Sequence, residues 1–85
     1  MRTIDSSTHA RFESALVAAE PVAALLDLAR ALKAERVSQN EMVRFYASKY
    51  GEHFDDKEDT IRDAIAAAAD CVCGHAYPRI FDTVV

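Results

Sequence analysis

Glycine and proline are scarce in this chain, and their scarcity limits its fold more than any other sequence feature. The 85 residues include two glycines and two prolines, and 51% of the residues are apolar. β-Sandwiches and barrels need many turns that are rich in glycine and proline, and disordered chains lack this much apolar surface. We therefore expect an all-α fold, a three- to four-helix bundle that forms a single domain over residues 1–85.

Apolar residues recur at helical spacing in four segments, which are separated by start and stop signals. Pro21 lacks the amide hydrogen that a helix interior needs, but it suits a first turn. Ser38 and Glu41 form a capping-box pattern, S-x-x-E, whereas Gly51 and Gly74 suit the left-handed conformation after a helix end. The predicted helices span about 8–19, 21–35, 39–50 and 57–73.

Short polar side chains precede the first and fourth predicted helices, and such side chains accept hydrogen bonds from free amides. We expect Ser6, Ser7 or Thr8 to cap the first helix, and Asp55 or Asp56 to cap the fourth. Each helix then carries an apolar stripe. The predicted core residues are Phe12, Ala15, Leu16, Ala19, Val22, Leu25, Leu26, Ala29, Leu32, Met42, Val43, Phe45, Tyr46, Tyr50, Ile61, Ala64, Ile65, Ala68 and Val72.

Residues 75–85 do not follow helical spacing and are expected to form a non-helical C-terminal tail. We expect Tyr77, Ile80 and Phe81 to fold back across the bundle, because water would otherwise surround their apolar surface. The core of such a bundle is thin, since 16 of the apolar residues are alanines. Homodimerisation is therefore an economical way to bury more apolar surface.

Acidic residues concentrate between residues 52 and 63. This stretch holds six acidic and two basic side chains, so its net charge of −4 equals that of the whole chain. Two interpretations stay open: acidic groups that complement the dipole at a helix start, or a patch that docks on a basic partner. The acidic residues are Glu52, Asp55, Asp56, Glu58, Asp59 and Asp63.

Aromatic residues lie next to this acidic stretch, at the end of the third predicted helix. Tyr46, Tyr50 and Phe54 are candidates for contacts with a partner, because aromatic residues are enriched at protein interfaces. The alternative is that the tyrosines belong to the core. The third predicted helix carries apolar residues on more than one face, which indicates either a central helix or an interface helix.

Cys71, Cys73 and His75 offer the thiolate and imidazole ligands that zinc and copper prefer. The spacing is poor for a metal site, because residues two apart on a helix point about 200° away from each other. Two cysteines this close also do not form the disulfide framework of a secreted protein. We expect two buried thiols near a helix end and no bound metal.

The sequence shows no catalytic motif. It has neither a nucleophile elbow nor a glycine-rich phosphate loop, so we expect a protein that is not an enzyme and has no cofactor. It also shows neither the apolar core of a signal peptide nor a run of about 20 apolar residues that would span a membrane. The expected location is cytoplasmic, without membrane association.

Residues 32–42 resemble the opening of helix-turn-helix DNA-binding domains, in which a basic helix is followed by a short turn and S-Q-x-E. The resemblance implies a following recognition helix with polar and basic side chains aimed at base edges. The next helix instead opens with four acidic residues between positions 55 and 59, which DNA phosphates would repel. We expect no nucleic-acid partner.

A second resemblance involves the C-terminal third of the chain. Some small all-helical bacterial proteins, among them toxin-neutralising immunity proteins, have a C-terminal pattern that this chain resembles at residues 58–63, Asp70, Cys73, Gly74 and residues 78–81. The resemblance implies a small acidic protein that covers a basic toxin surface. Our leading expectation is a non-enzymatic protein-binding module, and a self-associating regulatory or structural protein is the alternative.

Overall fold

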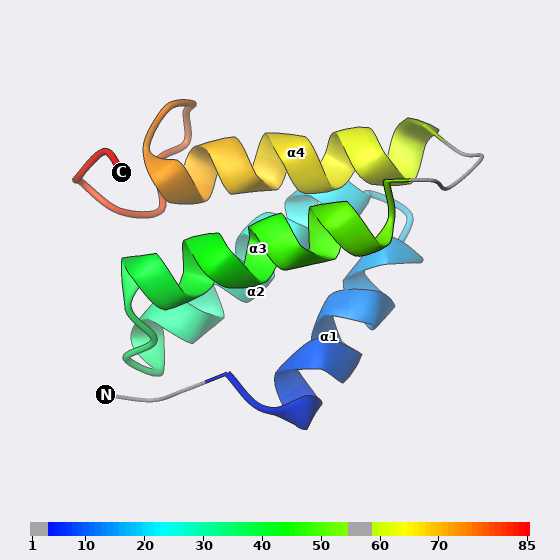
Figure 1. Cartoon of the computed structure of the whole chain (residues 1–85), viewed down its shortest axis with the longest axis horizontal. Helices are drawn as coiled ribbons and strands as arrows, with labels where there is room; N and C mark the ends of the chain where they lie inside the picture. Colours follow the sequence, from blue (N-terminus) through cyan, green and yellow to red (C-terminus); the bar gives the residue numbers. More distant parts are fainter. Residues whose placement is uncertain (1–3, 55–58) are drawn as a thin grey trace.

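The described part of the chain is a bundle of four helices. The computed structural model describes residues 4–54 and 59–85, and it contains no strand in those ranges, which confirms the all-α prediction. α3 and α4 lie antiparallel and side by side, α2 packs behind them, and α1 packs against α2 (Figure 1). The helices are α1 (Ser6–Leu16), α2 (Pro21–Ala34), α3 (Gln39–Glu52) and α4 (Asp59–Cys73).

Asp5 is the N-cap of α1. Its carboxylate accepts a hydrogen bond from the Thr8 amide at 3.1 Å, and also from the hydroxyls of Ser7 and Thr8. The prediction that Ser6, Ser7 or Thr8 caps this helix is therefore wrong. Those residues already lie within the first turn, because an aspartate one position earlier offers a carboxylate acceptor to the free amides.

α1 ends at Leu16, three residues before the predicted end. The chain uses residues 17–20 to turn into α2, where Pro21 occupies the first helical turn as predicted. Ala19 falls in this turn and is exposed. The prediction of Ala19 as a core residue is wrong, because helical spacing cannot be extended across a segment that is not helical.

The start of α3 follows the sequence signal, whereas its end does not. The Ser38 hydroxyl accepts a hydrogen bond from the Glu41 amide at 3.2 Å, which confirms Ser38 as the N-cap. Gly51 lies inside α3, which continues to Glu52, so the predicted stop at Gly51 is wrong. The left-handed conformation occurs instead at Arg36, between α2 and α3, where φ is 69°.

The core lies between α2, α3 and α4, and α1 covers one end of it. The rings of Phe12, Phe45 and Tyr46 meet edge to face there, with centroids 5.2–5.8 Å apart. Most predicted core residues are buried, but Val22 is exposed on α2. The buried apolar residues are Phe12, Ala15, Leu16, Leu25, Leu26, Leu28, Ala29, Leu32, Val37, Met42, Phe45, Tyr46, Ala64, Ile65, Ala68, Cys71, Val72 and Ile80.

The tail, residues 75–85, contains no helix and packs against the C-terminal end of α4 (Figure 1). Ile80 is buried and Phe81 is partly buried, as predicted. Tyr77 is 80% exposed, so the prediction that it packs on the bundle is wrong. Its ring lies instead on the surface under the Arg79 guanidinium, 4.8 Å from the ring centroid.

Gly74 and Gln39 help to hold the tail against the helices. Gly74 ends α4 with φ 86°, and a Cβ at this position would lie 2.6 Å from the Thr83 carbonyl oxygen. The Gln39 side-chain amide donates hydrogen bonds to the carbonyls of Val72 (3.0 Å) and Thr83 (2.8 Å). The start of α3, the end of α4 and the tail therefore form one packed unit.

Candidate functional site

The acidic stretch that the sequence singles out is only partly described. Asp55, Asp56 and Glu58, together with the predicted cap of α4, lie outside the described residues, and α4 begins at Asp59. Asp63 is exposed on α4. The acidic residues of this stretch are thus divided between two helices and the segment that joins them.

Glu52 is exposed and forms its ion pair on the side of α3 that faces α1. Its carboxylate lies 3.6 Å from the ammonium of Lys49, which in turn lies 3.9 Å from the carboxylate of Glu13 on α1. His53 joins the same group, with Nε2 3.4 Å from Glu13. Glu52 therefore belongs to a charged cluster between α1 and α3, and this cluster was not predicted.

Lys49 is the unusual member of this cluster, because it is only 4% exposed. Its aliphatic part is buried, and its ammonium lies 5.7 Å and 5.9 Å from the ring centroids of Phe12 and Phe45. Two ring faces and two carboxylates thus compensate the loss of water around the charge. The cluster stabilises the contact of α3 with α1, and we assign it a structural role.

The three aromatic candidates differ in their accessibility. Tyr46 is fully buried, and its hydroxyl donates a hydrogen bond to the Leu25 carbonyl at 2.7 Å. The expectation that Tyr46 contacts a partner is therefore wrong. Tyr50 is partly buried at the edge of the core, and Phe54 is 54% exposed. Of the three, Phe54 and the outer part of Tyr50 are accessible to another molecule.

Phe54 is held in place although it is exposed. Its ring packs edge to face on Tyr50, with centroids 6.0 Å apart. The Arg62 guanidinium covers the ring at 5.7 Å from its centroid and donates a hydrogen bond to the Phe54 carbonyl at 3.2 Å. One contact comes from α3 and the other from α4, so the ring is fixed by both helices that flank residues 55–58.

A hollow of about 260 Å³ lies between α3 and α4, and Tyr50, the ring partner of Phe54, lines it. Its walls are small side chains, with Tyr50 at one edge and Asp70 at another. Asp63 lies seven residues before Asp70, so both carboxylates are on the same side of α4. The hollow is lined by Ala47, Tyr50, Ala66, Ala69 and Asp70.

We refer to Tyr50, Phe54, Asp63, Asp70 and the adjoining hollow as the Phe54 face. Sequence reasoning identified Tyr50, Phe54 and Asp63 but missed Asp70 and the alanines of the hollow. The alanine run in α4 could have indicated the hollow, because small side chains leave a depression on the surface between two packed helices. The Phe54 face can receive an apolar side chain in the hollow and a cation at its carboxylates.

The two cysteines have the environment of structural thiols. Cys71 is buried and Cys73 is partly buried, and neither is in a disulfide. Burial raises the pKa of both thiols, and the negative charge of Asp70 raises each pKa further. Since the thiolate is the reactive form, both side chains are poor nucleophiles near neutral pH.

His75, the third candidate metal ligand, lies exposed at the start of the tail. Its Nε2 atom is 2.9 Å from the Val85 carbonyl oxygen, so the ring is part of the tail's own contacts. Among the residues that the structure describes, no three histidine, cysteine or acidic side chains come together in a group that would hold a metal ion. Cys71, Cys73 and His75 are therefore not arranged around a common metal position in the described structure.

Within residues 4–54 and 59–85, no helix is both long enough and apolar enough to cross a membrane. No protein-family model, curated protein or solved structure matches this chain.

Proposed function

We propose that this protein is a non-enzymatic protein-binding module and that the Phe54 face is its binding surface. The observation that carries the proposal is the state of Phe54, a large aromatic side chain that is 54% exposed yet held between Tyr50 and Arg62. Exposed aromatic rings that are already ordered lose little conformational entropy on binding, so more of their burial free energy contributes to affinity.

The hollow lined by Tyr50 supports the same function. Binding energy concentrates where an anchor side chain fills a pocket and neighbouring contacts exclude water. The hollow of about 260 Å³ suits one apolar side chain of a partner, and its alanine walls contribute no flexible groups that binding would have to order. Phe54 would in turn insert between side chains of the partner.

Charge indicates what kind of partner fits. Asp63 and Asp70 are exposed on the Phe54 face, and the chain as a whole carries a net charge of −4. A basic partner would be attracted over a distance of about one Debye length, about 8 Å at physiological salt. The partner we propose is a basic protein, and an immunity-like protein that covers a basic toxin surface is the most specific form of this proposal.

Self-association is the second candidate function, and a different surface favours it. Val17 is 83% exposed and Val22 is 39% exposed at the junction of α1 and α2. A hollow of about 410 Å³ lies next to them, lined by Pro21, Ala23 and Leu26 among others. Light scattering across a range of protein concentrations tests this candidate, since a constant monomer mass would exclude it.

The proposed function is tested by site-specific photo-crosslinking in lysate of the native host. A photoreactive phenylalanine analogue replaces Phe54 in one bait and Tyr77 in a matched bait, because Tyr77 is an aromatic residue on the tail that is even more exposed than Phe54. The proposal predicts one basic protein crosslinked through position 54 and absent at position 77. It also predicts a complex of the purified proteins that weakens when Asp63 and Asp70 are changed to lysine.

Equal crosslinking at both positions would contradict the proposal, because it would show a non-specific surface. So would purified proteins whose affinity does not respond to Asp63→Lys and Asp70→Lys. Asp82→Lys is the control for the charge change, since Asp82 is an exposed acidic residue on the tail.

A further inference from the structure

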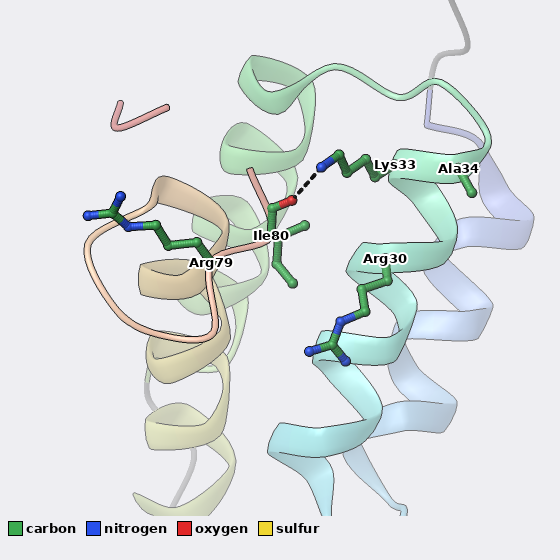
Figure 2. A pocket seen from close by; sticks show the side chains of 5 residues that line it. All are labelled: Arg30, Lys33, Ala34, Arg79 and Ile80. Carbon is green, nitrogen blue, oxygen red and sulfur yellow. Dashed lines mark hydrogen bonds between the residues drawn. The ribbon is translucent and has the colours of Figure 1, made fainter. Parts of the chain in front are cut away.

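A second hollow is lined by basic side chains, whereas the Phe54 face carries acidic ones. It has a volume of about 460 Å³ and lies between the last turns of α2 and the tail (Figure 2). Three of its five lining residues are cations, in a chain whose net charge is −4. The lining residues are Arg30, Lys33, Ala34, Arg79 and Ile80, and we call this hollow the basic pocket.

Lys33 is held at one edge of the basic pocket. Its ammonium donates a hydrogen bond to the Ile80 carbonyl at 2.9 Å and lies 5.1 Å from the centroid of the Phe81 ring. Figure 2 shows this side chain reaching from α2 across to the tail. An ammonium has three N–H donors, so the hydrogen bond to Ile80 orients the group and leaves two donors for a ligand.

Arg30 lies one turn before Lys33 on α2, and its side chain runs back along the helix toward the earlier turns of α2 (Figure 2). One of its terminal nitrogens is 3.2 Å from the Asp27 carboxylate, an exposed pair that orients the guanidinium. A guanidinium has five N–H donors in a planar fork. The pair with Asp27 therefore leaves most of the donors of Arg30 available.

Arg79 contributes the third cation from the tail. Its guanidinium stacks on the Tyr77 ring at 4.8 Å, on the side of the tail that faces away from α2 (Figure 2). Among the described residues, no carboxylate forms an ion pair with Arg79 or Lys33. Both arginine side chains are long and flexible, so each can turn toward a ligand that lies beside Lys33.

A helix dipole explains only part of this arrangement. Cations in the last turn of α2 complement its negative end, and this accounts for Lys33 and in part for Arg30. It does not account for Arg79, which comes from the tail and is 46 residues further along the chain. It also does not account for a hollow between these groups that is larger than one ordered water needs.

We propose that the basic pocket binds a small diphosphate-bearing ligand. Guanidinium groups recognise phosphate oxygens through paired hydrogen bonds, and an ammonium adds a point charge. Cations on two separate elements suit a ligand with two anionic groups better than a single phosphate ion. The volume is within the range of small-molecule sites, about 300–1,000 Å³, and Ala34 and Ile80 provide an apolar wall. This site is separate from the Phe54 face.

The test is a titration of the ¹⁵N-labelled protein with inorganic pyrophosphate, followed by NMR at physiological salt. We expect saturable shifts confined to the amides around residues 30–34 and 79–81, with a Kd below about 1 mM. Arg79→Gln and Arg30→Gln should each weaken binding by about tenfold, which corresponds to about 1.4 kcal/mol. Within the part of the chain that the structure describes, the contact of the Arg79 side chain is with the exposed Tyr77 ring, so we expect its variant to keep the fold.

Arg44→Gln is the matched control, because Arg44 is exposed on α3 and does not line the basic pocket. It removes the same charge and should leave the affinity unchanged. Three results would overturn the proposal: no saturable shift, an equal loss of affinity in Arg44→Gln, or equally tight binding of citrate. The last result would show a general response to polyanions rather than recognition of phosphate.

Discussion

The hydroxyl of Tyr46 donates a 2.7 Å hydrogen bond to the carbonyl oxygen of Leu25, and both residues are buried. The bond joins α3 to α2 through the middle of the core. A buried hydroxyl without such a partner would cost free energy, so the contact selects the register in which α3 packs on α2. It also explains why a tyrosine occupies a position that has no access to solvent.

Changing Tyr46 to phenylalanine should therefore destabilise the protein without changing its fold. We expect the free energy of unfolding to fall by about 0.5–1.5 kcal/mol, the usual net value of one hydrogen bond. Urea denaturation followed by circular dichroism measures the change. Tyr50→Phe is the control, since the structure gives the Tyr50 hydroxyl no buried role, and an equal loss in both variants would contradict this account.

The same side chain predicts how stability changes at high pH. Burial raises the pKa of Tyr46 above its ordinary value of 10.0. The contribution of the neutral phenol is complete below pH 10.0, and it is lost as pH rises, because the unfolded chain ionises first. The stability advantage of the wild type over Tyr46→Phe should thus shrink above pH 10.0 by at most about 1.4 kcal/mol per pH unit. A constant difference would contradict the prediction.

The sequence correctly predicted Met42, Phe45 and Tyr46 as core residues of α3 but missed Lys49. Met42, Phe45, Tyr46 and Lys49 are its buried residues, and they follow the spacing i, i+3, i+4, i+7. A lysine in the last position hides this stripe, because lysine is almost never fully buried. Tyr50 then looks like the next core residue, although it lies at the edge of the core.

Lys49 should contribute through its aliphatic part more than through its charge. Lys49→Ala removes packing against Phe12 and Phe45 and should cost about 2–3 kcal/mol, the lower part of the range for truncating a long buried side chain. Lys49→Met keeps the packing and should cost less than about 1 kcal/mol. The carboxylates of Glu13 and Glu52 are about half exposed, so water can solvate them when the ammonium is gone.

Thermal and urea denaturation of the two variants check this prediction. An equally large loss in Lys49→Met and Lys49→Ala would contradict it, since it would show that the ion pairs, rather than the packing, stabilise the contact with α1.

The two glycines should respond in opposite directions to substitution by alanine. Gly74 has φ 86°, and an added Cβ would lie 2.6 Å from the Thr83 carbonyl oxygen. Gly74→Ala should cost about 1–3 kcal/mol. Gly51 lies inside α3 with no atom within 4 Å of an added Cβ. Gly51→Ala should stabilise the protein by up to about 1 kcal/mol.

Hydrogen exchange locates the effect of Gly74→Ala. The amides of Ile80 and Val85 donate to the carbonyls of Cys71 and Cys73 at 3.1 Å and 2.9 Å. These two amides should exchange faster in Gly74→Ala, whereas amides in the middle of α3 should exchange as before. Unchanged protection of the tail would show that Gly74 does not fasten it.

Local signals predicted most helix boundaries, and competing local signals explain the exceptions. Pro21 marks a helix start because it has no amide hydrogen that would lack a partner there, and Ser38 marks one because its hydroxyl accepts from a free amide. Both effects are local and do not depend on tertiary contacts. Gly51 failed as a stop signal because glycine tolerates the helical conformation as well as the left-handed one. The sequence does not distinguish Asp5 as the cap of α1, because the three hydroxyl residues that follow it are equally good caps by type.

The candidate sites were harder to predict than the fold, because they depend on contacts between distant segments. The pairing of Phe54 with Arg62, and the presence of Arg30 and Arg79 around one hollow, both need the packed bundle. The charge count predicted an acidic surface but could not separate Glu52, which faces α1, from Asp63. Helical spacing gives the face of a helix on which a residue lies, but it does not give the neighbouring helix that this face contacts.

The thiols should react slowly at neutral pH. Burial and Asp70 raise the pKa of both Cys71 and Cys73, so little thiolate is present. Alkylation by iodoacetamide, read by mass spectrometry, should be slower than that of a free cysteine and should accelerate with rising pH. Cys73, which is less buried, should react before Cys71. Rapid modification of Cys71 at pH 7 would contradict this assignment.

The binding function of the Phe54 face is the central claim, and one calorimetric comparison tests it most directly. The basic protein captured at position 54 is titrated into the wild type, Phe54→Ala and Tyr77→Ala. We predict that Phe54→Ala weakens binding at least about thirtyfold, as expected for a hot spot of about 2 kcal/mol, and that Tyr77→Ala binds like the wild type. Equal affinity of Phe54→Ala and the wild type would contradict the claim.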